Sequence, residues 1–358
     1  MNKWKSLLIT TLLMVLPLAA CETAPEQTQA SNGDTQATSS KPTSRLDTVK
    51  SRGKLICGVD GGIPGFSYVD QNGNYSGIDV DVCKAVAAAL FNDPSAVEYR
   101  NLDATERFTA LSSGEVDMLA RNTTWTISRD TSVGLEFAPT TFYDGQGMMV
   151  RADSGMKTLK DMQGKSICVE AGTTSELNLT DNLRKQGVEA ETVTFQQADP
   201  AYAAYAEGRC DGMTSDKSQL IARRSNLPNP EEHILLDVTM SKEPLGPVTI
   251  NNDSAWFDTV KWVTYALIEA EELGITQANV DEMKNSTDPT IKRFLGLEGD
   301  LGTGMGLSND FAYNVIKQVG NYGEVYDRNL GKQSQFKLDR GLNDLWTNGG
   351  LLYSPPFR

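Results

Sequence analysis

The chain has 358 residues, of which 39% are hydrophobic and 22% are charged, and its formal net charge is −14. This length predicts two domains with packed cores. The acidic balance and the lack of a Lys/Arg cluster argue against a nucleic-acid partner. Five cysteines in so long a chain exclude a small fold held mainly by disulfides.

The first 21 residues are predicted to be a bacterial lipoprotein signal peptide. Lys3 and Lys5 precede the apolar run LLITTLLMVLPL, which is too short to span a bilayer comfortably. The sequence LAAC follows and is similar to a lipobox, in which Cys21 becomes the lipidated first residue. An ordinary signal peptide cleaved near Ala20 is the alternative. Removal of the segment changes the net charge from −14 to −16, because two lysines and no acids are lost.

Residues 22–44 are predicted to be a flexible tether. They are rich in Thr, Ser, Gln, Ala and Pro and have almost no large apolar side chain. Such a segment cannot bury enough surface to become ordered. It would therefore connect a lipid anchor at Cys21 to the folded part of the chain.

The first lobe is expected at residues 45–150, where strands alternate with helices. Alternation of this kind is typical of a doubly wound parallel sheet. The pattern predicts a helix at 45–52, a strand at 54–59, a hairpin at 68–77 that turns at Asn72-Gly73, a helix at 78–91 capped by Asp79, a strand at 96–102, a helix at 104–114 and a strand at 116–121.

A second α/β unit is expected at residues 151–245, and residues 246–358 are expected to return to the first lobe and extend it. Two crossings between lobes make a hinge, and the cleft between them can close on a ligand. The pattern predicts strands at 165–171, 191–197 and 211–215, helices at 173–187 and 200–210, a return strand at 243–253, an amphipathic helix at 254–274, and tail helices at 288–296 and 310–320. Aromatic residues of the tail are expected to pack over lobe 1.

Four cysteines remain after Cys21, and an even number in an exported chain suggests two disulfides. Three pairings are possible. We predict Cys57–Cys83 and Cys168–Cys210, because each pair then lies within one lobe. Free buried thiols are the alternative. Neither pair has the spacing of a redox motif or a zinc site, and we expect no metal and no cofactor.

Residues at the carboxyl ends of the predicted strands indicate an amino-acid site, because ligands of open α/β sheets bind there. Thr173 and Glu176 fit a capping box, and the free N–H groups of that helix favour an anion. A plain helix cap is the alternative. Arg129, on the other lobe, can bind a carboxylate through two hydrogen bonds. Asp216 can take an ammonium group, so the cleft suits an α-amino acid.

These residues make the chain similar to the periplasmic amino-acid-binding proteins of ABC importers, solute-binding protein family 3. Within that family it most closely resembles the general L-amino-acid-binding branch. The resemblance covers roughly residues 45–358 and implies the type II, or Venus flytrap, fold with a C-terminal helical extension. It rests on KLICGVDGGIPGFSY, GIDVDVCKAVAAALF, RNTTWTISRD, APTTFYDGQGMMVR, AGTTSELNL, SKEPLGP and NYGEVYDRNLG with LNDLWTNGGLLYSPPFR.

The resemblance also implies roles for individual residues. Arg129, five residues after Thr124, would hold the ligand α-carboxylate, and Asp216 would hold the α-ammonium. The other residues expected to line the pocket are Asn122, Thr123, Gly172, Thr173 and Thr174.

Departures from narrow-specificity relatives predict a roomy, permissive site. Those relatives place aromatic rings near positions where this chain has Ile63 and Ala104. Asp60 and Arg107 could together serve polar, acidic or basic ligand side chains through direct or water-mediated contacts. The alternative for each is a salt bridge or a helix-face charge without a ligand role.

The expected function is therefore a lipid-anchored, extracytoplasmic, monomeric receptor that delivers L-amino acids to a membrane permease. His233, the single histidine, is expected to be exposed and solvated, and no catalytic motif is present. Two alternatives remain. A periplasmic dehydratase of the same fold would use Asp60 or Glu106 as its general acid, and a sensory module would use the same pocket.

Overall fold

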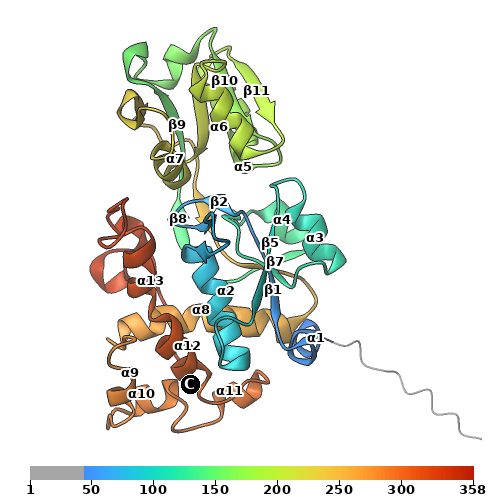
Figure 1. The fold of residues 1–358 in the computed structure, drawn as a ribbon, viewed down its shortest axis with the longest axis vertical. Helices are drawn as coiled ribbons and strands as arrows, with labels where there is room; N and C mark the ends of the chain where they lie inside the picture. Colours follow the sequence, from blue (N-terminus) through green and yellow to red (C-terminus); the bar gives the residue numbers. More distant parts are fainter. Residues whose placement is uncertain (1–43) are drawn as a thin grey trace, which may run out of the picture. The chain divides into compact units, whose positions relative to one another are not determined.

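This computed structural model describes residues 44–358. Their fold is built around two five-stranded sheets (Figure 1). The predicted signal peptide, the lipidation site at Cys21 and nearly all of the tether lie outside the described residues. Ser44, placed at the end of the tether, caps the first helix, because its side chain accepts a hydrogen bond from Asp47 N.

The first sheet has the strand order β5-β1-β6-β15-β7 and is mixed. Strand β1 runs parallel to β5 and β6, whereas β15 runs antiparallel to β6 and β7. The three strands of the expected parallel unit are parallel, and β15 joins them from the opposite direction after the chain has left the sheet. The strands are β1 Leu55–Val59, β5 Val97–Asn101, β6 Met118–Leu119, β7 Leu135–Phe137 and β15 Val248–Ile250.

The second sheet has the order β11-β10-β12-β9-β13, with β9 antiparallel to both neighbours. Strand β9 precedes residue 151, where the second lobe was expected to begin, so that boundary lies one strand too late. The strands are β9 Gln146–Arg151, β10 Ser166–Glu170, β11 Glu191–Phe195, β12 Gly212–Asp216 and β13 His233–Leu235. We call the elements around the first sheet lobe 1 and those around the second lobe 2.

Two antiparallel strands connect the lobes: β8, Phe142–Asp144, and β14, Glu243–Leu245. The predicted return strand at 243–253 is therefore two strands, β14 and β15, separated at Gly246-Pro247. The predicted hairpin is present in a small sheet of β2 Gly62–Ile63, β3 Ser67–Val69 and β4 Tyr75–Ser76.

Helices cover both sheets and form the tail. Lobe 1 has α1 Arg45–Arg52, α2 Ile78–Phe91, α3 Arg107–Ser113, α4 Ile127–Thr131 and α8 Ser254–Glu272. Lobe 2 has α5 Thr174–Gln186, α6 Ala198–Ala206 and α7 Lys217–Arg224. The tail has α9 Val280–Met283, α10 Pro289–Phe294, α11 Leu301–Gly304, α12 Phe311–Val319 and α13 Tyr322–Asn329. Short 3₁₀ helices occur at Ala152–Ser154, Leu159–Met162, Pro230–Glu232, Gly341–Asn343 and Trp346–Asn348.

Helix α2 begins differently from the prediction, because Gly77 and not Asp79 is its N-cap. Gly77 has a φ of 125°, and a Cβ there would lie 2.0 Å from the backbone oxygen of Phe66. Only glycine fits this close approach. Asp79 lies in the first turn instead, and its carboxylate accepts a hydrogen bond from Asn122 N at 3.2 Å.

The C-terminal tail packs against lobe 1, as expected, and extends its core. The predicted stripe on α8 is buried along its whole length, from Trp256 to Ala270. Phe311 and Phe357 from the tail join the same cluster. Burial of each such side chain contributes roughly 1.5–3 kcal/mol, so the tail is part of the lobe's stability.

His233 is buried with 2% of its surface exposed, and the prediction of an exposed histidine is wrong. It begins β13 at the edge of the second sheet. Its Nδ1 lies 3.0 Å from the Tyr205 hydroxyl and its Nε2 lies 3.2 Å from Pro228 O. These contacts give it a structural role.

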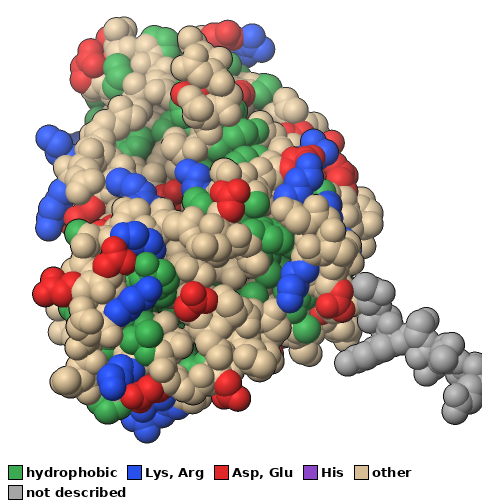
Figure 2. Space-filling view, turned by 60° about the horizontal axis from the view of Figure 1, so that its bottom comes forward, with side chains coloured by type: hydrophobic (Ala, Val, Ile, Leu, Met, Phe, Trp, Pro, Cys, Tyr) green, Lys and Arg blue, Asp and Glu red, His purple; other side chains and the backbone are tan. Residues whose placement is uncertain are grey.

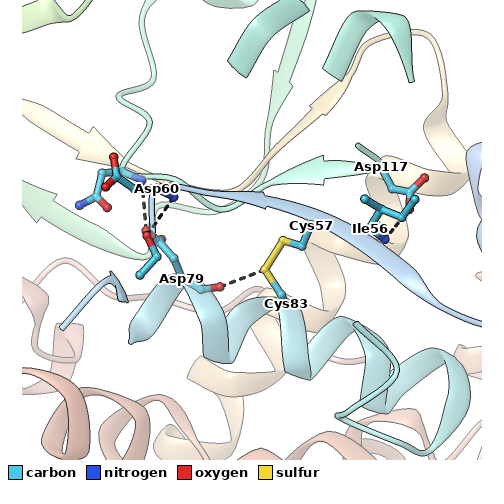
Figure 3. Close-up of a disulfide and its surroundings, with 8 residues drawn as sticks. Ile56, Cys57, Asp60, Asp79, Cys83 and Asp117 are labelled. Carbon is cyan, nitrogen blue, oxygen red and sulfur yellow. Dashed lines mark hydrogen bonds between the residues drawn. A yellow bond between two sulfur atoms is a disulfide. The ribbon is translucent and has the colours of Figure 1, made fainter. Parts of the chain in front are cut away.

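Both predicted disulfides are present. Cys57–Cys83 joins β1 to α2 with a Cα–Cα distance of 6.3 Å (Figure 3). Cys168–Cys210 joins β10 to the loop before β12 with a Cα–Cα distance of 5.7 Å. Each bond therefore lies within one lobe and leaves the hinge free.

Acidic and basic side chains are interspersed on the face shown in Figure 2. No basic patch of the kind that binds nucleic acid stands out there. Among the residues described, no helix has the length and apolar character needed to cross a membrane.

Candidate ligand-binding site

A small polar cavity lies between the lobes. Lobe 1 contributes the loop after β6 and the start of α3, and lobe 2 contributes the ends of β10 and β12 with the starts of α5 and α7. The volume that the centre of a water molecule can occupy in this cavity is about 20 Å³. This volume holds about one water, so the lobes are closed around the cavity. The lining residues are Arg107, Arg121, Asn122, Thr124, Glu170, Thr173, Thr174, Ser175, Ser215, Asp216 and Gln219.

The structure brings many of the predicted site residues into this lining and places others behind it. Predicted residues that line the cavity are Arg107, Asn122, Thr124, Thr173, Thr174 and Asp216. Predicted residues that are absent from the lining are Asp60, Thr123, Arg129 and Gly172. Of these, Gly172 approaches lobe 1 closely, since a Cβ there would lie 3.0 Å from the Thr105 side chain.

Arg129 is buried directly behind the lining residue Thr124. Its Nη1 donates a hydrogen bond to Thr124 O at 2.8 Å, and its guanidinium carbon lies 5.2 Å from the centre of the Phe108 ring. Burial lowers the pKa of Arg129, while the carboxylates of Glu243 and Asp216 partly oppose that effect. The charge of Arg129 is thus separated from the cavity only by Thr124.

Asn122 is a cavity residue whose side-chain polar atoms lack hydrogen-bond partners. It is 9% exposed, and neither its side-chain oxygen nor its nitrogen has a hydrogen-bond partner. Its φ of 41° is unusual for a residue other than glycine. Buried polar groups without partners are rare, and strained backbone concentrates at functional sites. Asp79 accepts a hydrogen bond from Asn122 N and so holds this strained backbone in place. Burial raises the pKa of Asp79 to about 7.

Arg107 gives lobe 1 an unpaired cation at the cavity. It is 2% exposed, its Nε has no hydrogen-bond partner, and its Nη1 donates only to Arg121 O at 3.4 Å. Burial lowers the pKa of Arg107 well below its ordinary value, and the nearby positive charges of Arg121 and Arg129 add to this. An anion at this end of the cavity would relieve both effects.

Asp216 gives lobe 2 a buried carboxylate at the cavity, which a cation would stabilise. It ends β12 and precedes α7. Burial raises its pKa well above the ordinary value, and the neighbouring carboxylates Asp144 and Glu243 raise it further. A cation beside it would favour the ionised form. The cavity therefore has a cationic side and an anionic side, which together match a zwitterion.

Arg121 and Glu170 line the cavity but were missed as site residues. Arg121 Nη2 lies 2.6 Å from Asp60 Oδ2 in its own lobe and 3.4 Å from Glu170 Oε1 in lobe 2. Arg223 of lobe 2 lies 3.6 Å from Asp60 Oδ1. A buried chain of ion pairs thus joins the lobes, and Asp60 belongs to it rather than to the lining. Arg121 follows a strand and Glu170 ends one, so a search of the residues at the carboxyl ends of the strands could have found both.

Ile63 and Ala104, expected to make the site roomy, are buried in the protein and absent from the lining. Within the described part of the chain, no aromatic ring lines this cavity. The two carboxylates considered as general acids are also elsewhere: Asp60 is paired with arginines, and Glu106 is exposed. No cluster of metal-ligating side chains occurs in residues 44–358.

Comparisons with known proteins agree with this geometry. Residues 55–332 match the profile of the bacterial extracellular solute-binding proteins, family 3. The general L-amino acid-binding periplasmic protein AapJ of Rhizobium johnstonii is 55% identical over 87% of this chain and 92% of its own length. The glutamate/glutamine/aspartate/asparagine-binding protein BztA of Rhodobacter capsulatus is 50% identical over 88% of this chain and 94% of its own.

A solved structure is similar as well. A periplasmic binding protein of an ABC transporter from Brucella ovis, with glutathione bound, is 50% identical and superimposes with a TM-score of 0.86 over 88% of this chain and 99% of its own. The family match, the curated relatives and this fold all span the two lobes and the cavity between them. The chain therefore belongs to the bacterial extracellular solute-binding proteins of family 3.

Proposed function

We propose that this protein is the substrate-binding subunit of an ABC importer and that it binds free L-amino acids with broad specificity. The observation that carries the proposal is the cavity between the lobes, whose lining has Arg107 from lobe 1, with an unpartnered Nε, and the buried Asp216 from lobe 2, whose pKa burial raises. The names of AapJ and BztA, which describe binding of several amino acids by those proteins, support it.

The ligand α-carboxylate would lie against Arg107, with Arg129 behind Thr124 and the free N–H groups at the start of α5 adding to its stabilisation. Its α-ammonium would lie beside Asp216. Because these groups belong to different lobes, the ligand makes all its contacts only when the lobes are closed. That difference in contacts is what shifts the protein towards the closed form.

Broad specificity would follow from the pair Arg121–Glu170 at the lining. Their separation of 3.4 Å is longer than an ideal charged hydrogen bond. An acidic or amide side chain could accept a hydrogen bond from Arg121 in place of Glu170, and a basic side chain could pair with Glu170. When a basic side chain pairs with Glu170, Arg121 keeps its partner Asp60.

A tripeptide such as glutathione is a second candidate ligand, because the Brucella ovis relative was solved with it. Its γ-glutamyl end carries the same α-carboxylate and α-ammonium as a free amino acid. A wider cavity of about 590 Å³ opens between the lobes around Gly62, Tyr68 and Tyr202 and reaches Arg223. The Nε of Arg223 has no partner among the described residues, whereas its Nη atoms pair with Asp60 and Asp199, so a second carboxylate would share this cation with them.

The remaining parts of the proposal concern the whole chain. Residues 1–21 would direct export, lipidated Cys21 would anchor a monomer outside the cytoplasm, and residues 22–43 would act as the tether. Lobe 1 would comprise residues 45–141 and 246–358, and lobe 2 residues 145–242. The protein would deliver its ligand to a permease without changing it chemically, since neither proposed general acid lines the cavity.

Isothermal titration of the ligand-stripped chain without its anchor, residues 22–358, against the twenty L-amino acids and glutathione tests the proposal. We expect micromolar affinities, about −8 kcal/mol, for several amino acids. Tight binding of glutathione alone would favour the second candidate. Binding of none of these ligands would contradict both.

A further inference from the structure

Glu243 lies on the hinge strand β14, directly behind the cavity, and is 1% exposed. Its Oε2 accepts hydrogen bonds from Thr124 Oγ1 of lobe 1 at 2.6 Å and from Thr174 Oγ1 of lobe 2 at 2.8 Å. Both threonines line the cavity. A single carboxylate oxygen from the hinge therefore contacts both walls of the site.

The other oxygen of Glu243 is also occupied. Its Oε1 accepts from Asn178 Nδ2 of α5 at 2.9 Å and from the Ser241 hydroxyl. A carboxylate only accepts hydrogen bonds, so every partner around Glu243 must donate. The orientation of these donors is thereby fixed, because none of them can be turned round without facing Glu243 with a lone pair.

This arrangement decides the polarity of the two threonine hydroxyls. A hydroxyl has one proton to donate, and Thr124 and Thr174 both direct it to Glu243. Their oxygens, 3.4 Å apart, are left with only lone pairs for the cavity. A ligand group that meets them must donate hydrogen bonds, and the α-ammonium is the part of an amino acid that only donates.

We infer that Glu243 is a positioning residue: in the closed arrangement it turns Thr124 and Thr174 into hydrogen-bond acceptors, so that together with Asp216 they receive the ligand's α-ammonium. The inference rests on the proposed function and adds to it. It assigns the Thr124 hydroxyl to the ammonium, a role that the family resemblance left open for Thr124. It also connects the hinge to the ligand, since the threonines meet at one oxygen only when the lobes are together.

Glu243→Gln tests the inference with little change in shape. The glutamine amide nitrogen donates, so it must face an oxygen that accepts; where it takes the place of Oε2, a threonine oxygen accepts its proton and the threonine's own proton is released towards the cavity. We expect the Kd of L-glutamate, measured by isothermal titration, to rise about 10- to 100-fold, the usual range for one hydrogen bond to a charged group. Glu269→Gln, which changes a buried carboxylate of α8 outside the cavity, is the matched control and should leave the Kd unchanged.

A second ligand separates this role from a merely structural one. (S)-2-Hydroxyglutarate has a hydroxyl in place of the ammonium, and a hydroxyl can accept as well as donate. In Glu243→Gln its Kd should rise by about threefold or less, since it can accept the released proton. A structural defect would weaken both ligands by the same factor, and that result would overturn the inference.

A double-mutant cycle keeps the test valid if Glu243→Gln is poorly stable. Thr174→Val removes the same hydroxyl from a partly exposed position. It should weaken L-glutamate binding about tenfold in the wild-type chain and clearly less in Glu243→Gln, because the hydroxyl then no longer presents a fixed acceptor. Additive losses would contradict the inference. If the wild-type chain bound no amino acid, the proposed function itself would fail. Normal wild-type binding that Glu243→Gln leaves within twofold would refute only the role of Glu243.

Discussion

The two lobes bring opposite charges to the cavity. Lobe 1 contributes arginines, of which Arg107 has an unpaired Nε. Lobe 2 contributes the carboxylates Glu170 and Asp216, whose pKa values burial raises. The charged residues that each lobe contributes to the cavity lining are therefore of one sign, and closure joins the two sets through Arg121 and Glu170. Closure and ligand binding therefore both bring opposite charges together at the cavity, and the experiments below test what each lobe contributes.

The largest effect is expected from the cations of lobe 1. Arg129→Ala should weaken amino-acid binding by about 2–5 kcal/mol, because the ligand carboxylate would remain desolvated with less positive charge nearby. Titration calorimetry measures the loss. Arg184→Ala, on the exposed face of α5, is the control and should bind normally. Wild-type affinity in Arg129→Ala would show that Arg107 and the start of α5 hold the carboxylate without it.

The cores of the lobes also differ, because lobe 1 has a large cluster that is continuous with the tail and a smaller one around Leu111 and Leu119, whereas lobe 2 has two small clusters on the two faces of its sheet. Removing either disulfide should lower the free energy of unfolding by roughly 3–4 kcal/mol. The loops closed are 26 and 42 residues long, so the loop-closure terms differ by only about 0.4 kcal/mol. Cys168→Ala/Cys210→Ala should nevertheless unfold lobe 2 separately in urea. A single shared transition would mean that the lobes unfold as one unit.

Asp79 tests the strained wall of lobe 1. Burial raises its pKa in the folded state to about 7, from an ordinary value of 3.8, so the folded state binds more protons and stability falls as pH rises from about 4 to 7. Asp79→Asn removes the titration and should be more stable than wild type at pH 8, by an amount on the order of 4 kcal/mol. The two should match near pH 4 in chemical denaturation. A stability gap that stays constant with pH would indicate that Asp79 is ionised throughout.

Asp216 makes the same argument for binding in lobe 2. An ammonium beside it lowers its raised pKa, so binding at neutral pH should release protons and affinity should rise with pH. The expected gain is about tenfold, or 1.4 kcal/mol, per unit of pH while Asp216 is protonated in the free protein. Titrations in buffers of different ionisation enthalpy count the protons. Asp216→Asn should bind weakly and lose the pH dependence.

The smallest effect is expected from the ion pair between the lobes. Glu170→Gln leaves Arg121 paired with Asp60, so no buried charge loses its partner and the change in overall affinity should be the smallest of the series. Its signature is in selectivity, because basic amino acids should lose affinity relative to acidic ones. Asp181→Asn, an exposed acid on α5, should change neither. Equal losses for all ligands would mean that Glu170 acts only in closure.

Strand ends and cysteine count were enough to predict much of the site and the covalent pairs. Arg107, Thr124, Thr174 and Asp216 follow predicted strands or begin the next helices, and all line the cavity. Errors arose where a side chain's partner is distant in sequence. Asp79 was taken as a helix cap because its acceptor role depends on Asn122 in another element. His233 was taken as exposed because its polar loop gives no sign of β13.

The sequence by itself determined the α/β alternation, the paired cysteines and the family, because these depend on local periodicity, on the number of cysteines and on recognisable stretches. Only the tertiary structure decided which charges meet. Asp60 pairs with Arg121 and Arg223, and Glu243 gathers hydroxyls from both lobes, because the hinge brings together residues far apart in the chain. Electrostatic and hydrogen-bond energies depend on distance in space and on burial, and neither can be read from the order of residues.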